Sequence, residues 1–268
     1  MHLILANGVY GVPEHFGALQ TALEPRLPTK VFTFTRVGEP DPNPDHGFGP
    51  MVERLDAIVC GSPGPVALLG FSLGGALALD YALLHAERLA ALVLVNAFDR
   101  FQVGNLAPGV FPPLWRVAMQ LPHRGFMSRI VHGLPWLRRG VFHPDATLAD
   151  VERGMAQSAA STAEDLRFQL AHLCLPLPEG HRHRLAQLAE TIPVLLVNSR
   201  DDLVVHPGHT ARLAEAMPAA RRLPPFVGGH AFFQHDGAAL ANVVLEFLAE
   251  VEKTKPAPPS GTDTLDQC

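Results

Sequence analysis

The sequence predicts an α/β fold: a mostly parallel central sheet with helices on both faces and an inserted helical lid. In both flanks of the chain, short runs that are apolar throughout alternate with segments of helical spacing, whereas the middle holds no comparable strand. Strands that are apolar on both faces need helices on both sides of the sheet, and the alternation favours parallel pairing through right-handed crossovers.

The individual elements follow from the length and spacing of the apolar runs. The expected strands are residues 2–7, 30–37, 65–71, 89–98 and 192–199. The expected helices are residues 13–25, 51–60, 73–86, 211–217 and 239–251.

The same pattern divides the chain into parts. Residues 1–98 and 191–251 are expected to form the core of the fold. Residues 99–190 are rich in proline and aromatic side chains and then in helical spacing, so we expect a lid over the carboxyl edge of the sheet. Residues 252–268 are polar and proline-rich, which predicts a disordered tail.

Composition argues against several kinds of partner. With 21 Lys and Arg against 26 Asp and Glu, the net charge is −5, and no basic run offers a nucleic-acid site. No apolar segment has the length of a membrane span, and the first residues lack the features of a signal peptide. Cys60, Cys174 and Cys268 form no CxxC pair and are expected to be reduced thiols. We therefore expect a cytoplasmic protein with no nucleic-acid or membrane partner; nothing in the sequence indicates an oligomeric state.

One histidine cluster has the composition of a metal site. His181 and His183 alternate with arginines in the segment GHRHR, residues 180–184. The arginines would repel a cation, and no carboxylate or cysteine completes a ligand set. We interpret the segment as a solvated loop and expect no metal.

Ser72 is the one hydroxyl in the stretch LLGFSLGGALAL, residues 68–79. A strand that turns sharply into a helix strains the residue at the turn and brings together the positions two before and two after it. Gly70 and Gly74 stand at those positions and remove the clash. The hydroxyl is then presented beside a helix N-terminus, which favours negative charge. A phosphate-binding turn is the alternative, but neither Gly-Lys-Ser/Thr nor G-x-G-x-x-G is present.

Gly70-Phe71-Ser72-Leu73-Gly74 matches G-x-S-x-G, and on this motif the chain resembles the α/β-hydrolase family. The resemblance covers both flanks of the lid. It implies Ser72 as the nucleophile, followed along the chain by an acid and then a histidine. His230, in VGGHAFF near the end of the core, matches the histidine of the family, whereas His235 lies past that loop.

The acid implied by the resemblance follows the strand at 192–199, where Asp201 and Asp202 are adjacent. Aligned on the apolar pair that comes next, Asp202 takes the acid position, although His206 stands where proline is usual. This departure leaves Asp201 as an alternative. Relatives that carry the acid one strand earlier would use Asp99. The aspartate that is not the acid would cap a turn or a helix.

The family's oxyanion hole consists of two backbone N–H groups. The resemblance implies that Leu73 supplies one and Val9 the other, with Tyr10 as the alternative to Val9. Asn7 stands where the family has a histidine, which leaves the backbone donor available.

Together these residues predict a serine hydrolase that cleaves a carboxylic ester or a related acyl bond without a cofactor. A thioesterase, an acyltransferase or a carbon–carbon bond hydrolase on the same residues is the alternative. A non-catalytic binding protein on this scaffold is disfavoured because all three roles are filled. We expect a small-molecule ester or thioester substrate.

Large apolar side chains of the lid are expected to form its own core, with an acyl pocket as the alternative. They are Phe101, Phe111, Trp115, Met119, Phe126, Met127, Trp136 and Phe142. The lid's arginines are interpreted as surface charge, with a carboxylate or phosphate of the substrate as their alternative partner.

Overall fold

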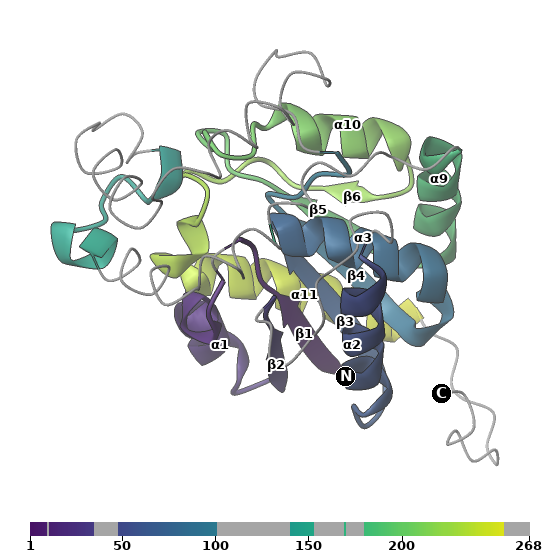
Figure 1. The fold of residues 1–268 in the computed structure, drawn as a ribbon. Helices are drawn as coiled ribbons and strands as arrows, with labels where there is room; N and C mark the ends of the chain where they lie inside the picture. Colours follow the sequence, from purple (N-terminus) through teal and green to yellow (C-terminus); the bar gives the residue numbers. More distant parts are fainter. Residues whose placement is uncertain (10, 35–47, 101–139, 153–168, 170–179, 255–268) are drawn as a thin grey trace.

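A six-stranded sheet with the order β2-β1-β3-β4-β5-β6 forms the centre of the computed structural model (Figure 1). The structure describes residues 1–9, 11–34, 48–100, 140–152, 169 and 180–254. The strands are β1 (His2–Ala6), β2 (Thr29–Phe32), β3 (Val66–Phe71), β4 (Leu89–Val95), β5 (Val194–Val197) and β6 (Arg221–Arg222). Every pair in this sheet is parallel, and the predicted α/β class is confirmed.

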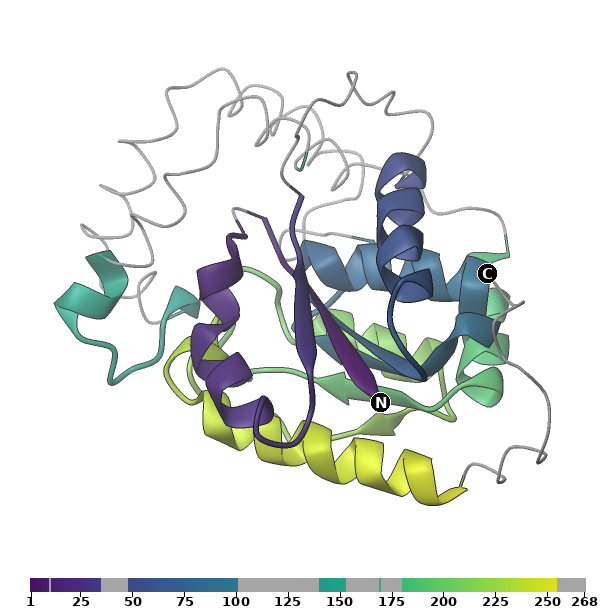
Figure 2. The ribbon, with the colours of Figure 1, turned by 90° about the horizontal axis from the view of Figure 1, so that it is seen from below.

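Helices cover both faces of the sheet (Figure 2). They are α1 (Gly17–Leu23), α2 (Gly49–Cys60), α3 (Leu73–His85), α9 (His181–Thr191), α10 (Gly208–Ala216) and α11 (Gly237–Thr254). Three short 3₁₀ helices are η1 (Pro13–Phe16), η3 (Ala86–Arg88) and η4 (Phe232–Gln234). α1 and α11 lie on one face, and α2, α3, α9 and α10 lie on the other.

The alternation of side chains along the strands creates two hydrophobic cores. In β3, Val66 and Leu68 pack with α2, α3, α9 and α10, whereas Ala67 and Leu69 pack with α1 and α11. Successive side chains of a strand point to opposite faces, so a strand buried on both faces must be apolar throughout. All six residues of β3 and all seven of β4 are buried, which explains their unbroken apolar runs.

The segment GHRHR is not a loop, so that prediction is wrong. Its last four residues open α9, directly after Gly180, whose φ of 70° starts the turn. His181, Leu185 and Leu188 form the buried stripe of this helix. Because the first buried position of α9 is a histidine rather than an apolar residue, the apolar spacing of the sequence did not predict a helix here. α9 packs against α3 and α10, so a helix of the core begins inside the range assigned to the lid.

Several other boundaries differ from the prediction, and β6 was not among the expected strands. β2 ends at Phe32 rather than at residue 37. α11 continues to Thr254, three residues into the range predicted as a tail, and the Thr254 hydroxyl donates to the carbonyl of Val251. Residues 255–268 and most of the predicted lid lie outside the described residues. Within the described part of that range, Phe142 packs against Val151.

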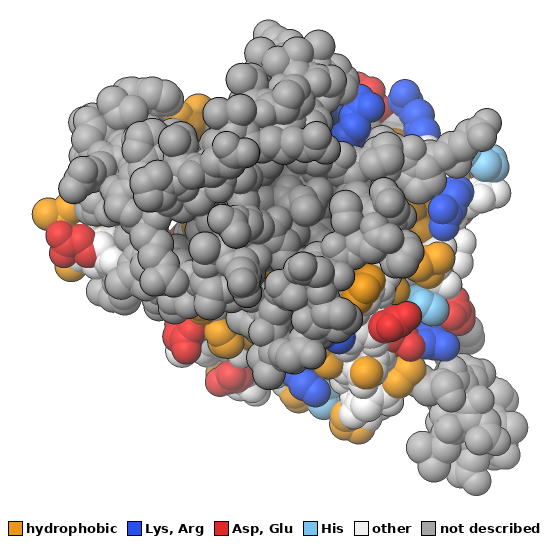
Figure 3. Space-filling view, in the orientation of Figure 1, with side chains coloured by type: hydrophobic (Ala, Val, Ile, Leu, Met, Phe, Trp, Pro, Cys, Tyr) orange, Lys and Arg blue, Asp and Glu red, His pale blue; other side chains and the backbone are white. Residues whose placement is uncertain are grey.

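Three properties bear on the expectations from composition. Cys60 is disulfide-bonded, so the expectation of reduced thiols is wrong for this residue. Within the described residues, no helix combines the length and apolar character that crossing a membrane requires. On the face in Figure 3, described acidic and basic side chains are interspersed around the rim.

Candidate active site

Ser72 stands at the sharp turn between β3 and α3, with φ 55° and ψ −121°. L-residues rarely adopt positive φ, and such strain persists only where neighbouring structure enforces it. A Cβ on Gly70 would lie 2.5 Å from the carbonyl oxygen of Gly74, and one on Gly74 would lie 2.2 Å from that of Ala6. The close approach of Gly70 and Gly74 that the sequence predicts is present, and Gly74 also leaves room for the backbone at the end of β1.

Hydrogen bonds tie this turn to the sheet. The N–H of Ser72 donates to the carbonyl of Val95 at 3.1 Å, which joins the turn to the end of β4. Leu73 is the first residue of α3, so its N–H has no acceptor within the helix. The serine is therefore held by main-chain contacts, and the N–H directly after it has no acceptor within the helix.

The loop after β1 lies against the serine. A Cβ on Gly8 would be 3.0 Å from the Cβ of Ser72. Asn7 is fully buried and braces the loop: its Oδ1 accepts from the Gly8 N–H at 2.9 Å, and its Nδ2 donates to the Val12 carbonyl at 2.8 Å. Val9 follows directly, whereas Tyr10 lies outside the described residues. Asn7 thus orders the loop that carries the expected second donor.

His230 and Asp202 are brought together. The Nδ1 of His230 lies 2.7 Å from Oδ2 of Asp202, whose side chain is fully buried. The other carboxylate oxygen accepts from the N–H groups of Val204 and Val205, at 2.7 and 2.8 Å. A carboxylate can only accept, so this pairing places the imidazole proton on Nδ1 and leaves Nε2 able to take a proton.

The other two candidate acids have different partners. Asp201 accepts from the Ser199 hydroxyl at 2.5 Å and from the N–H groups of Gly228 and Gly229 at 3.0 and 3.1 Å. Burial favours a higher pKa for Asp201, but these hydrogen bonds outweigh it, and the pKa lies below its ordinary value. Asp99 accepts from the N–H of its neighbour Arg100 at 2.7 Å. Among the three aspartates, the structure pairs His230 with Asp202.

Two residues that hold the histidine loop were missed from the sequence. Asn96 has φ 44°; its Nδ2 donates to the His230 carbonyl at 2.7 Å, and its Oδ1 accepts from the Ser199 N–H at 2.8 Å. The Gly140 carbonyl accepts from the His230 N–H at 3.0 Å. An asparagine directly after a buried strand, at a position able to adopt positive φ, is the signal that could have indicated Asn96.

Phe71 connects the two halves of the site. It precedes Ser72, and its ring centroid lies 4.7 Å from that of His230. Phe71 also packs edge-on against Phe233, at 4.8 Å, in the core beneath the histidine loop. His230 is therefore paired with Asp202 and packs against the residue that precedes Ser72.

Comparison with known proteins identifies the family of the chain. The profile of a family described as "Alpha/beta hydrolase family" matches residues 3–243. The chain belongs to the α/β-hydrolase family. Known structures share the fold of this α/β hydrolase: a bromoperoxidase from Bacillus anthracis superposes with a TM-score of 0.72, at 16% identity, over 92% of this chain and 91% of that one.

Three relatives show the range of the family. Polyketide synthase ThaQ of Burkholderia thailandensis is 30% identical over 92% of this chain, which spans only 12% of ThaQ. Putative carbamate hydrolase RutD of Klebsiella pneumoniae is 27% identical over 92% of this chain and 91% of its own. The pimeloyl-[acyl-carrier protein] methyl ester esterase of Aeromonas hydrophila is 28% identical over 74% and 75%, respectively.

Proposed function

We propose that this chain is a serine hydrolase that cleaves a carboxylic ester through an acyl-enzyme on Ser72. The observation that carries the proposal is the buried 2.7 Å hydrogen bond between His230 and Asp202, beside a serine held at positive φ. A nucleophile, a base and a group that orients the base are the three parts that acyl transfer requires.

The reaction takes two steps. In the first, Oγ of Ser72 attacks the acyl carbon while its proton passes to Nε2 of His230. The imidazolium then protonates the departing alcohol, and the carbon–oxygen bond of the ester breaks. In the second step, His230 takes a proton from water as the water oxygen attacks the acyl carbon. The bond between that carbon and Oγ of Ser72 then breaks, the imidazolium returns the proton to Oγ, and the acid leaves. Asp202 stabilises the imidazolium in both steps.

The negative charge of each tetrahedral intermediate needs hydrogen-bond donors. The N–H of Leu73 at the start of α3 and the N–H of Val9 in the braced loop are the donors we assign. Each is worth about 3 kcal/mol of transition-state stabilisation by comparison with other oxyanion holes. Both are main-chain groups, so no side-chain substitution removes them directly.

An oxygen ester is the substrate class we favour. The methyl ester esterase and the carbamate hydrolase among the relatives act on acyl groups joined to a heteroatom. Thioesters, acyl transfer and carbon–carbon bonds use the same three residues and form the alternative.

Hydrolysis of p-nitrophenyl esters of graded acyl length by wild type and Ser72→Ala tests the proposal. We expect wild-type activity that falls by about 10⁶-fold, to the background, in Ser72→Ala. Ser62→Ala is the matched control, because the Ser62 hydroxyl bonds only to the local carbonyl of Ile58 among the described contacts. Wild-type activity retained in Ser72→Ala would overturn the mechanism.

A second panel separates the substrate classes. Matched methyl ester, p-nitrophenyl carbamate and acyl thioester substrates are compared by kcat/KM. The proposal expects the oxygen ester to be cleaved best. A thioester preferred by tenfold or more, with the same dependence on Ser72, would replace the ester in the proposal and keep its mechanism.

A further inference from the structure

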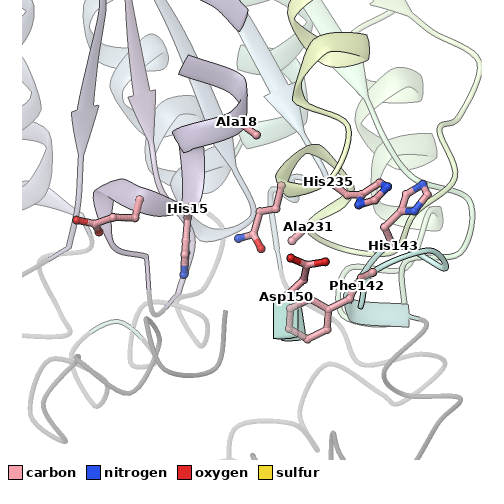
Figure 4. A pocket seen from close by; sticks show the side chains of 10 residues that line it. His15, Ala18, Phe142, His143, Asp150, Ala231 and His235 are labelled. Carbon is pink, nitrogen blue, oxygen red and sulfur yellow. The ribbon is translucent and has the colours of Figure 1, made fainter. Parts of the chain in front are cut away.

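A second cluster of polar side chains lies beside the proposed catalytic residues. His143, Asp145 and His235 each present one atom able to bind a metal, and these atoms lie within 4.8 Å of one another. The two imidazole rings stack, with centroids 4.2 Å apart and an interplanar angle of 16° (Figure 4). The three residues are far apart in sequence from Ser72 and take no part in the proposed reaction.

We propose that His143, Asp145 and His235 bind a divalent transition-metal ion such as Zn²⁺. Two imidazole nitrogens and a carboxylate oxygen form a donor set that Zn²⁺ and other divalent first-row transition metals favour. Ligand atoms about 2.0–2.1 Å from a tetrahedral Zn²⁺ stand about 3.3 Å from one another. Nδ1 of His143 and Oδ2 of Asp145 are already 3.8 Å apart.

The remaining closure requires the His235 and Asp145 side chains to turn, because two stacked rings cannot both direct an in-plane nitrogen lone pair at one ion. The Asp145 side chain is 81% exposed, and His235 is exposed as well, so both can rotate. The N–H of Asp145 donates to Nδ1 of His143 at 3.1 Å, so this nitrogen presents its lone pair toward Asp145. A metal ion bound to this lone pair would take the place of the Asp145 N–H.

The surroundings favour a cation. Both histidines line a pocket of about 350 Å³, to which Glu14 and Asp150 contribute carboxylates. The described lining residues include no Lys or Arg. His15 lines the same pocket from η1 (Figure 4), and its buried Nε2 has no hydrogen-bond partner among the described residues. The pocket has room for the water molecules that would complete the coordination of the ion.

The position of the cluster indicates what the ion would do. His143 belongs to the segment whose Gly140 and Val141 carbonyls accept from the N–H groups of His230 and Ala231. His235 directly follows η4. An ion held by both would join the two segments that flank His230 and stabilise that loop. Its binding does not depend on Ser72 acting as a nucleophile.

Zn²⁺ binding to the chelator-treated protein tests the proposal. Competition with a chromogenic zinc chelator gives stoichiometry and affinity, and thermal unfolding with and without Zn²⁺ gives the stabilisation. We expect one Zn²⁺ per chain and a raised unfolding midpoint. His235→Gln and Asp145→Asn should each weaken binding by at least about tenfold. His206→Gln, at an exposed histidine outside the cluster, and Ser72→Ala should bind as wild type does.

Two results would overturn the proposal. One is wild-type affinity in both His235→Gln and Asp145→Asn, which would place any bound Zn²⁺ elsewhere. The other is a folded wild type that binds no Zn²⁺ at concentrations that saturate the chelator, which would leave a stacked histidine pair only. Because Asp145 is exposed, Asp145→Asn is expected to fold, so loss of binding in that variant is not explained by unfolding.

Discussion

The two halves of the proposed active site are held by different means. Around Ser72 the contacts are steric and main-chain, because Gly70 and Gly74 let backbone pack directly on backbone. Around His230 the contacts are polar side-chain bonds, which Asn96, Asp201 and Asp202 make across the ends of neighbouring strands. We therefore expect the serine half to be destabilised by substitutions that add atoms at its glycines. The histidine half should instead be damaged by substitutions that remove a hydrogen-bond partner.

The largest effect that this contrast predicts is on activity. Asp202→Asn keeps the shape of the side chain but removes the charge that orients His230, so kcat should fall by about 10³–10⁴-fold. Asp201→Asn should lower kcat far less, because Asp201 orders Gly228 and Gly229 rather than the imidazole. Steady-state kinetics on one ester compares them. Equal losses in the two variants would show that the adjacent aspartates do not have separate roles.

The next effect is on folding of the serine half. Gly74→Ala places a Cβ against the carbonyl of Ala6, which cannot move without shifting β1, so stability should fall by about 3 kcal/mol or more. Gly17→Ala is the matched control, because nothing lies within 4 Å of its added Cβ. Urea unfolding of both variants measures the difference. A loss below about 1 kcal/mol for Gly74→Ala would contradict steric specification of this half.

A smaller effect is expected in the histidine half. Asn96→Ala leaves the Ser199 N–H and the His230 carbonyl without their partner and puts alanine at positive φ, at a cost of about 2 kcal/mol. We also expect a roughly tenfold lower kcat in the folded variant. Asn198→Ala is the control, because the buried Oδ1 of Asn198 has no partner within the part of the chain that the structure describes. The contrast fails if Asn198→Ala is the more damaging of the two.

The smallest effect is a loss of stability at low pH. It concerns His15, whose buried Nε2 has no hydrogen-bond partner among the described residues. Burial lowers the pKa of His15 to about 4, against a weaker opposing effect of Glu14. The unfolded chain therefore binds this proton first as pH falls below 6.5, and stability is lost progressively down to about pH 4. Near pH 4.5 the loss relative to pH 7 should reach about 2 kcal/mol.

Urea unfolding of wild type and His15→Phe at both pH values measures this loss. Burial raises the pKa of Asp80 to about 6, against a weaker opposing effect of Arg184. This raised pKa makes the folded chain bind the Asp80 proton first, so it increases stability as pH falls over the same range. That contribution is common to both proteins and cancels in the comparison. An unchanged difference between the two proteins at both pH values would show that His15 is not buried in its neutral form.

The same contrast explains how far sequence reasoning reached. Five of the six strands and the turn at Ser72 could be predicted because apolar runs and the spacing of Gly70 and Gly74 are local properties of the chain. β6 was missed because it consists of two exposed arginines and has no apolar run. The pairing of His230 with Asp202 followed from a resemblance, since no local pattern distinguishes Asp202 from Asp201. Asn96 was missed because its role depends on residues 134 positions away. α9 was missed because its buried stripe begins with a histidine.

The hydrogen bond between Asn96 and His230 joins residues that are synthesised at different times. A ribosome releases the turn that carries Ser72 long before it adds the segment that contains the proposed base. Until both Asn96 and His230 have left the exit tunnel, the growing chain displays a serine with nothing to take its proton. In the proposed mechanism, a chain arranged in this order gains its reactivity only after β5 has joined the sheet and the loop that carries His230 has folded against Asn96.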